Sequence, residues 1–267
     1  MIYLRDVSLP DDPPDVWPFS VPAIHATRKI SFETPVTYIA GDNGSGKSTL
    51  MEALAVKLKL PAVGRTDAGR DDTLAGLKPL AQSMKHTFSA RPKNRFFLRS
   101  EDFFNFVLSL EREKRELKAE LARVEAEYKD RSVFAQNQAR SAFQSSMYAM
   151  ESRYGRDLLS QASHGESFLR LFMQRIVPNG LYLLDEPEVP LSPLRQLTLL
   201  SLIKDMSENE QCQFIIATHS PILLAYDKAE IISMDEAPAK KTSWDELESV
   251  SLLKDFLGDP QGFIRRL

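Results

Sequence analysis

Apolar residues along the chain form two kinds of pattern, and these alternate in the C-terminal half. Short runs without charge are typical of strands buried on both faces of a parallel sheet. Such runs occupy residues 35–40, 181–184, 214–217 and, more weakly, 231–234. Leucines 50, 54 and 58 recur at helical spacing within 48–60, and another helix is predicted over 191–206. This alternation predicts an α/β fold with a mostly parallel sheet covered by helices.

The N-terminal part shows shorter and more broken patterns. Strands are predicted at 2–7, 29–32 and 95–99, where β-branched and aromatic residues gather. Prolines interrupt the segment 11–22, so we expect a loop without regular structure there. The segment 64–80 is rich in Gly, Asp and Thr and is predicted to be a mobile surface loop.

A long polar segment, 101–154, contains neither glycine nor proline. Its apolar residues follow steps of seven, four, three and four, which form a short coiled-coil-like seam: Leu110, Leu117, Leu121, Val124 and Tyr128. We predict two helices with a break near 130–133. Each seam is too short for an independent coiled coil, so a packed helical subdomain is favoured over a protruding arm. The C-terminal segment 244–267 is also predicted to be helical, with a break at 258–260.

The composition is that of an ordinary globular protein. The 267 residues include 43% hydrophobic and 27% charged residues, with a formal net charge of -3, so no general attraction to nucleic acid is indicated. The single cysteine, Cys212, excludes an intrachain disulfide and a cysteine-built zinc site, and we expect it to be a buried hydrophobe. Neither a signal peptide nor an integral membrane segment is predicted, so we expect a cytoplasmic protein.

The clearest chemical motif lies between the predicted strand 35–40 and the helix that follows it. It fits the phosphate-binding pattern GxxxxGK[ST], and its residues after Gly41 and Asp42 are Asn43, Gly44, Ser45, Gly46, Lys47, Ser48 and Thr49. Glycines let successive N–H groups point at one anion, and the helix N-terminus faces the same phosphates. Lys47 would hold the β- and γ-phosphates, and the Ser48 hydroxyl would bind Mg²⁺.

Two further strands end in polar groups. The strand 181–184 leads into Asp185 and Glu186, which predicts an aspartate ligand for magnesium followed by a general base for the attacking water. The strand 214–217 leads into His219, which lies where ligands bind in open α/β sheets and could contact the γ-phosphate or the water. An acidic turn and a structural histidine are the alternatives.

These motifs, in this order, resemble the ABC ATPase superfamily, and the run 43–49 looks most like its soluble SMC and RecF-like branch. The whole chain is similar to short stand-alone bacterial ATPases described as AAA-family. The resemblance implies an ABC-type P-loop head with an N-terminal antiparallel β part and an inserted helical subdomain. It implies an N-terminal lobe at 1–95, the inserted subdomain at 96–165 and a C-terminal lobe at 166–267.

The resemblance also identifies a fourth motif. Residues 163–167 look like a variant of the ABC signature, and Ser163 and Gly165 match the positions that contact the γ-phosphate held by the other subunit. A simple helix N-cap is the alternative. Ser192 stands where the family's D-loop has aspartate. No glutamine follows the strand 95–99, where transporter ATPases carry one, and Ser100 or Glu101 could substitute.

Two aromatic residues, Trp17 and Phe19, precede the P-loop at about the distance of an adenine-stacking residue, but we favour hydrophobic anchors of the proline-rich loop.

The function expected from these residues is an ATP-driven switch. Two subunits would bury ATP and Mg²⁺ in a head-to-tail homodimer, hydrolysis would release them, and a protein or nucleic-acid partner would respond to the change. The alternatives are a motor subunit of an ABC transporter, a P-loop kinase and a pseudo-enzyme. The missing glutamine and the unusual signature count against the transporter motor. The pair Asp185 and Glu186 beside His219 favours water as the nucleophile and counts against the kinase. The same pair together with Lys47 counts against the pseudo-enzyme.

Overall fold

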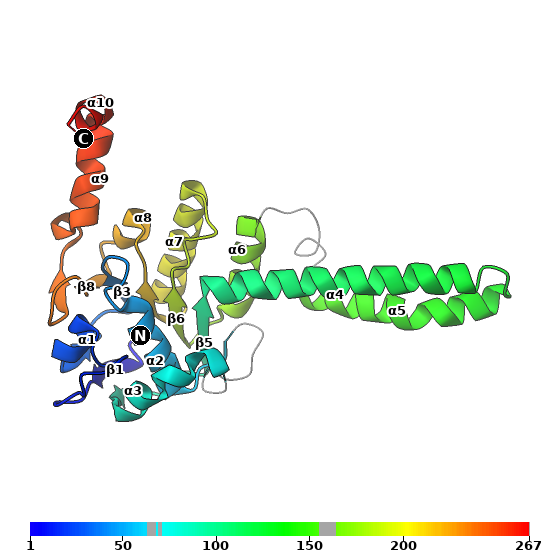
Figure 1. The fold of residues 1–267 in the computed structure, drawn as a ribbon, viewed down its shortest axis with the longest axis horizontal. Coiled ribbons are helices and arrows are strands. Elements are labelled where there is room, and N and C mark those ends of the chain that lie inside the picture. The colour runs from blue at the N-terminus through cyan, green and yellow to red at the C-terminus, as the bar shows by residue number, and fades with distance from the viewer. Residues whose placement is uncertain (63–67, 69–70, 155–163, 267) are drawn as a thin grey trace. The chain divides into compact units, whose positions relative to one another are not determined.

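The computed structural model describes residues 1–62, 68, 71–154 and 164–266 (Figure 1). Two compact units divide the chain: one holds residues Met1–Ser100 together with Arg175–Leu267, and the other holds Glu101–Gln174. The first unit contains both β-sheets, and the second consists of helices. No helix within the described ranges has the length and apolar character needed to cross a membrane.

A six-stranded sheet forms the centre of the first unit, in the order β5-β6-β7-β3-β8-β9. The first five strands are mutually parallel and β9 pairs antiparallel with β8, which confirms the predicted α/β fold with a mostly parallel sheet. The strands are β3 (Val36–Ala40), β5 (Asn94–Arg99), β6 (Gly180–Asp185), β7 (Gln213–Ala217), β8 (Glu230–Ser233) and β9 (Lys240–Thr242).

Both faces of this sheet are buried, because side chains alternate between them along each strand. Residues such as Ile39, Leu183 and Ile215 join the core that includes helix α2 (Lys47–Leu58). Their neighbours Tyr182 and Phe214 point the other way and stack with ring centroids 5.4 Å apart. Helix α7 (Pro193–Glu208) packs against β7. The apolar runs of the sequence therefore mark strands covered on both sides.

A smaller antiparallel sheet, in the order β2-β1-β4, comes mainly from the N-terminus, as predicted. Its strands are β1 (Leu4–Ser8), β2 (Lys29–Ser31) and β4 (Lys85–Phe88). The buried side chain of Gln213 on β7 links it to the large sheet. Gln213 Oε1 accepts the backbone N–H groups of Tyr3 and Leu4, both at 2.8 Å, and Gln213 Nε2 donates to the Leu4 carbonyl at 2.9 Å.

The prediction of a mobile surface loop over 64–80 is wrong for its second half. Helices η2 (Asp72–Leu77) and α3 (Lys78–Ser83) occupy this stretch. Leu74, Leu77 and Leu80 are at most 2% exposed and belong to the core. Their spacing of three buries one side of the segment, which the frequent polar residues obscured.

The second unit contains two long helices and a shorter one: α4 (Ser100–Glu127), α5 (Val133–Tyr154) and α6 (His164–Arg175). Helices α4 and α5 form a hairpin, and Arg140 Nε lies 3.1 Å from Glu125 Oε1 across it (Figure 1). The break falls where the sequence predicts it. Phe103 at the start of α4 packs on Phe168 of α6, with ring centroids 4.9 Å apart.

The seam residues Leu117, Leu121 and Val124 are half-buried, in agreement with the predicted pattern. Among the described side chains between 104 and 149, none is buried. The described side chains of this part therefore meet along one half-buried seam. A two-helix hairpin can bury only one stripe of each helix.

The remaining helices of the first unit are short. They are α1 (Pro22–Ala26), α8 (Pro221–Leu224), η3 (Trp244–Glu246), α9 (Glu248–Gly258) and α10 (Pro260–Ile264). The last three confirm a helical C-terminal segment with a break at 258–260. Cys212 is buried, and its Sγ lies 3.4 Å from the carbonyl oxygen of Val177.

Candidate active site

The glycine-rich loop connects β3 to α2 and turns tightly between them. Gly41, Gly44 and Gly46 have φ angles of 147°, 83° and 99°, which side chains disfavour. A Cβ atom at Gly46 would lie 2.4 Å from Val21 Cγ1, so the backbone can approach Val21 only because this position is glycine. The loop conformation that the sequence predicts is thus set by local sterics.

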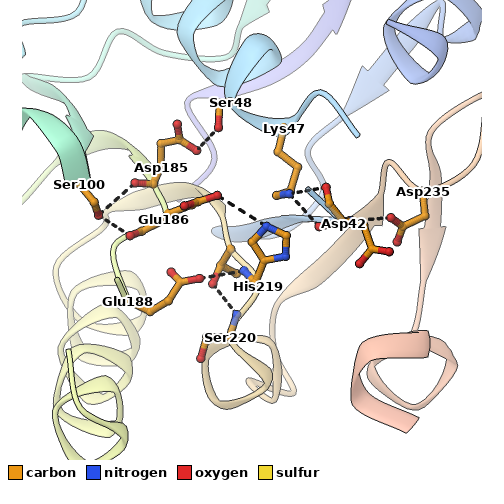
Figure 2. A network of polar contacts seen from close by, with 12 residues as sticks. Asp42, Lys47, Ser48, Ser100, Asp185, Glu186, Glu188, His219, Ser220 and Asp235 are labelled. Carbon is orange, nitrogen blue, oxygen red and sulfur yellow. Dashed lines mark hydrogen bonds and ion pairs between the residues drawn. The ribbon is translucent and has the colours of Figure 1, made fainter. Parts of the chain in front are cut away.

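Lys47 is the first residue of α2 and is only 4% exposed. Its Nζ donates to the carbonyl oxygens of Gly41 at 2.7 Å and Asp42 at 2.9 Å, so the ammonium lies inside the curve of the loop. Burial lowers the pKa of Lys47, and the carboxylates of Glu186 and Asp185 oppose that shift. The cation is therefore held where an anion can bind (Figure 2).

Ser48 and Asp185 meet although 137 residues separate them in the chain. The Ser48 hydroxyl donates to Asp185 Oδ1 at 3.2 Å. Asp185 ends β6 and is 6% exposed; burial raises its pKa to about 7, and the hydrogen bond from Ser48 partly counters this. A buried carboxylate of this kind is stabilised in its charged form by a cation. The parallel sheet brings the two oxygens together because β6 and β3 both lead into this edge.

Glu186 leaves the strand in an unusual backbone conformation. Its φ is +50°, and its N–H donates to the Ala217 carbonyl on β7 at 2.9 Å. Its Oε1 lies 3.6 Å from His219 Nε2, and both side chains are about one-third exposed. The two residues that the sequence selects as base and sensor therefore face each other at the sheet edge (Figure 2).

Two further residues hold this edge. Glu188 is 9% exposed, and its Oε1 accepts the backbone N–H of His219 at 2.8 Å. Burial raises the pKa of Glu188, whereas hydrogen bonds from Thr218 and from backbone N–H groups lower it. The Ser100 hydroxyl at the end of β5 donates to the Glu186 carbonyl. Ser100 was a candidate for the missing glutamine. Glu188 was missed, and its signal is that a third acidic residue closely follows Asp185 and Glu186.

Asp235 was also missed by the sequence reasoning. Its Oδ1 accepts the backbone N–H of Asp42 at 2.6 Å, and its Oδ2 accepts the Ser233 hydroxyl at 3.2 Å (Figure 2). Asp235 lies two residues after the end of β8, directly after the apolar run 231–234, so an acid after an apolar run was the available signal. Asp235 fixes one side of the phosphate loop to the neighbouring strand.

A cavity of about 600 Å³ opens beside the loop. Asn43, Gly44 and Ser45 line it, as do Thr218 and His219. Ser45 Oγ and His219 Nε2 are buried atoms without a hydrogen-bond partner in the described structure. Buried polar atoms without partners are rare, so these two are suited to bind a polar ligand in the cavity.

Comparison with known proteins agrees with this geometry. The model of a family described as "AAA domain, putative AbiEii toxin, Type IV TA system" matches residues 70–225, which is more than half of the chain. The chain belongs to this AAA-domain family. The match includes Asp185, Glu186 and His219, and the P-loop precedes it. A search of curated proteins finds no match.

Solved structures with a similar arrangement are ABC cassettes and SMC heads. CbiO1 of Clostridium perfringens, part of the ABC transporter complex cbiONQ, is 18% identical; the match covers 100% of both chains with a TM-score of 0.47. The Smc head domain of Pyrococcus furiosus is 15% identical over 96% of this chain and 100% of that one, with a TM-score of 0.45.

The remaining predicted residues of this AAA-domain protein occupy different places. Thr49 lies half-buried in the first turn of α2. Ser163 lies outside the described residues, and Gly165 lies in the first turn of α6, in the helical unit. Ser192 precedes α7 as its N-cap without a side-chain cap bond.

Trp17 and Phe19 are both absent from the lining of the cavity. Phe19 is buried in the core, and a Cβ atom at Gly76 would lie 2.6 Å from the Trp17 ring. The burial of Phe19 agrees with its interpretation as a hydrophobic anchor, whereas Trp17 is 59% exposed although its ring lies against Gly76.

The donor set fits magnesium rather than a metal held by protein alone. Within the described ranges, no group of three or more His, Cys, Asp or Glu could hold a metal ion. Ser48 and Asp185 supply two oxygen atoms, and Mg²⁺ commonly completes such a set with water and substrate phosphates. The residues present therefore fit a magnesium–nucleotide complex.

Proposed function

We propose that this protein hydrolyses ATP at the edge of the parallel sheet. The observation that carries the proposal is the meeting of the Ser48 hydroxyl with the Asp185 carboxylate, 3.2 Å apart, beside the buried ammonium of Lys47. A hydroxyl, a carboxylate and a lysine on a glycine-rich loop are the groups that P-loop ATPases use for a magnesium–triphosphate complex. Membership of an AAA-domain family supports the same reading.

Each group of the loop has a defined task in this proposal. Lys47 would exchange its bonds to the Gly41 and Asp42 carbonyls for phosphate oxygens, and Ser45 Oγ would donate to the phosphates. The N-terminus of α2 and the backbone N–H groups of the loop that have no partner in it would face the same anion. Magnesium, held through Ser48 and Asp185, would neutralise charge on the phosphate oxygens.

Glu186 is proposed as the general base. Its carboxylate would accept a proton from the attacking water, and its direction is set by the bond of its N–H to Ala217 and of its carbonyl to Ser100. His219 would donate from its ring to the γ-phosphate or orient the water. Glu188 holds the backbone of His219 in place, so it acts as a positioning residue.

A second copy of the chain is proposed to complete the site. Ser163 and Gly165 would contact the γ-phosphate held by the other copy, as in the family that the motif resembles. Val189 and Leu194, which closely follow the acidic pair, are 56% and 75% exposed although apolar. Exposed apolar residues beside a site are suited to an interface. The hairpin of α4 and α5 would then contact the partner, protein or nucleic acid, that responds to ATP.

The test measures phosphate release and solution mass together. Glu186→Gln should keep ATP binding, lower turnover at least a hundredfold and accumulate as a dimer with MgATP, seen by light scattering. Ser163→Arg should bind ATP as a monomer and lose hydrolysis. Normal hydrolysis by Glu186→Gln would contradict the role of the base, and normal hydrolysis by Ser163→Arg would contradict the shared site.

The transporter-motor alternative predicts a different result. A motor subunit would couple to a membrane partner, so the purified chain would hydrolyse ATP slowly until that partner is added. Full turnover of the purified protein without membranes favours the switch. A Glu186→Gln chain that binds ATP and stays monomeric would instead favour the alternative, because a different chain would then complete the site.

A further inference from the structure

One side chain of helix α7, Gln196, forms two hydrogen bonds that the proposed chemistry does not use. Its Nε2 donates to the Leu191 carbonyl at 3.1 Å, and its Oε1 accepts the Ser220 hydroxyl at 2.6 Å. Leu191 belongs to the segment that follows the acidic pair, whereas Ser220 directly follows His219 in the chain. Gln196 therefore connects two loops that meet at the edge of the sheet.

Glutamine is suited to such a link because its amide carries both a donor and an acceptor. The Leu191 carbonyl needs a donor, and the Ser220 hydroxyl can donate one bond while it accepts another. Ser220 Oγ does both, because it also accepts the N–H of Leu223 at 3.2 Å as the N-cap of α8. Support of the first turn of α7 would require only the bond to Leu191. The bond to Ser220 therefore points to a link between the loops.

The turn that carries His219 is held from two sides. On one side, Glu188 Oε1 accepts the N–H of His219 at 2.8 Å (Figure 2). On the other, Gln196 holds the hydroxyl of Ser220, whose N–H donates to Thr218 Oγ1 at 3.0 Å. The Nε2 atom of His219 forms no hydrogen bond in the described structure. The direction of this nitrogen therefore depends on how the backbone of the turn is held.

The other end of the link lies in the surface proposed for the second copy. Val189 and Leu194 are exposed, and Leu197, which directly follows Gln196 on α7, is 52% exposed. Leu191 lies between the first two of these residues in the chain but is only 6% exposed. A second copy that covers the exposed side chains would therefore fix the turn of α7 from which Gln196 reaches both loops.

We propose that Gln196 is a positioning residue that couples docking of the second copy to His219. The inference rests on the proposed function, because it takes the second copy to bind at Val189 and Leu194 and His219 to act at the γ-phosphate. Gln196 touches neither the nucleotide nor the water. Once α7 is fixed by the second copy, the Gln196 amide holds Ser220, and the turn of His219 has both of its anchors in place.

The test separates turnover from nucleotide binding and from dimer formation. Gln196→Met has a side chain of similar length and loses both hydrogen bonds. Its kcat, measured by phosphate release, should fall about tenfold, because a catalytic group that is held less firmly loses rate. In the Glu186→Gln background, calorimetry with MgATP and light scattering should give a Kd and a dimerisation midpoint that change by less than threefold.

A second comparison shows whether the effect passes through His219. Added to His219→Ala, Gln196→Met should lower kcat no further than His219→Ala alone, because the group that it positions is already absent. Equal tenfold losses in both backgrounds would overturn the inference, since the loss would then come from the fold or from another residue. A wild-type kcat in Gln196→Met would overturn it as well.

Gln196→Glu provides a second variant in case Gln196→Met folds poorly. It keeps an acceptor for Ser220 but, when ionised, has no donor for Leu191, so its kcat should fall at least threefold. A wild-type kcat in Gln196→Glu would contradict the coupling between the two loops.

The matched control is Thr198→Ala on the same helix. Thr198 is exposed, and its hydroxyl donates to the Leu194 carbonyl of its own helix at 3.3 Å, so kcat should not change. A wild-type chain that does not hydrolyse ATP, or a His219→Ala chain with full kcat, would overturn the proposed roles themselves. The failure of the inference can therefore be told apart from the failure of the proposed function.

Discussion

The edge of the large sheet and the α4–α5 hairpin are held together in opposite ways. At the sheet edge, Ser48, Asp185 and His219 come from three elements, and their positions depend on contacts between residues more than a hundred positions apart. In the hairpin, Leu117, Leu121 and Val124 form one half-buried seam between neighbouring helices. A site that must hold atoms within a few tenths of an ångström requires the first arrangement. A segment that contacts a partner can use the second.

The largest effect is expected from removing the buried ion pairs of Arg99, which lie beside the sheet edge. Arg99 ends β5 opposite Asp185 and pairs with Glu52 at 2.8 Å and with Asp71, which is 1% exposed, at 3.2 Å. Arg99→Leu removes a buried cation that pairs with both carboxylates, so the free energy of unfolding should fall by about 3–5 kcal/mol. Urea unfolding followed by tryptophan fluorescence measures this. Arg95→Leu, on the same strand at an exposed position, should cost less than 1 kcal/mol.

The next largest effect is expected from a variant that loses a phosphate-binding group while the fold of the sheet edge is kept. Lys47→Ala should weaken MgATP binding at least a hundredfold, about 2.7 kcal/mol, because the phosphates lose a charge-assisted hydrogen bond. Calorimetry with MgATP gives the value. Lys57→Ala, on the same helix but outside the loop, is the control and should bind normally. Affinities within threefold of each other in the two variants would argue against a phosphate role for Lys47.

A smaller effect is expected in the hairpin. Leu121→Ala removes part of a half-buried seam, so it should destabilise the hairpin by about 1 kcal/mol, less than a fully buried leucine would. Hydrogen exchange should rise in the amides of 105–149, while MgATP affinity stays within twofold. Lys118→Ala, at an exposed position of the same helix, should leave exchange unchanged. A large loss of ATP affinity would show that the seam supports the site.

The smallest effect concerns pH and Glu188. Because burial raises its pKa, the folded state favours the protonated form, and the stability from this group is lost as pH rises through the folded pKa. Glu188→Gln keeps an oxygen to accept the His219 N–H and removes the buried charge. The difference in Tm between this variant and wild type should be about 2 °C more favourable to the variant at pH 8 than at pH 5. Glu248→Gln, an exposed change, should show no such difference.

The sequence predicts those parts of the fold that depend on neighbouring residues. Strands β3, β6 and β7 are continuous apolar runs, and the phosphate loop needs its glycines in one order, so both can be predicted from local pattern. Strand β4 was missed because Lys85, His86 and Thr87 are polar and exposed. The core leucines at 74, 77 and 80 were missed because Gly, Asp and Thr surround them.

The site was predictable only in its motif residues. Asp185, Glu186 and His219 follow buried strands, and the sheet edge brings them together. Glu188 and Asp235 act through backbone N–H groups of His219 and Asp42, and no residue spacing records such contacts. The position of α9 beside the cavity depends on the path of the chain after β9, which no local pattern determines. The roles of Ser163 and Gly165 stay predictions.

The Gln213 amide that joins the two sheets has a consequence for how the protein is made. The backbone N–H groups of Tyr3 and Leu4 find their acceptor 210 and 209 residues later in the chain. At ribosomal rates of about 5–20 residues per second, the N-terminal strand must wait roughly 10–40 s for that partner. During synthesis β2 and β4, which pair with β1, emerge long before Gln213, so the two N–H groups are the last part of the small sheet to find their acceptor, and we expect the start of the chain to become ordered only when Gln213 emerges.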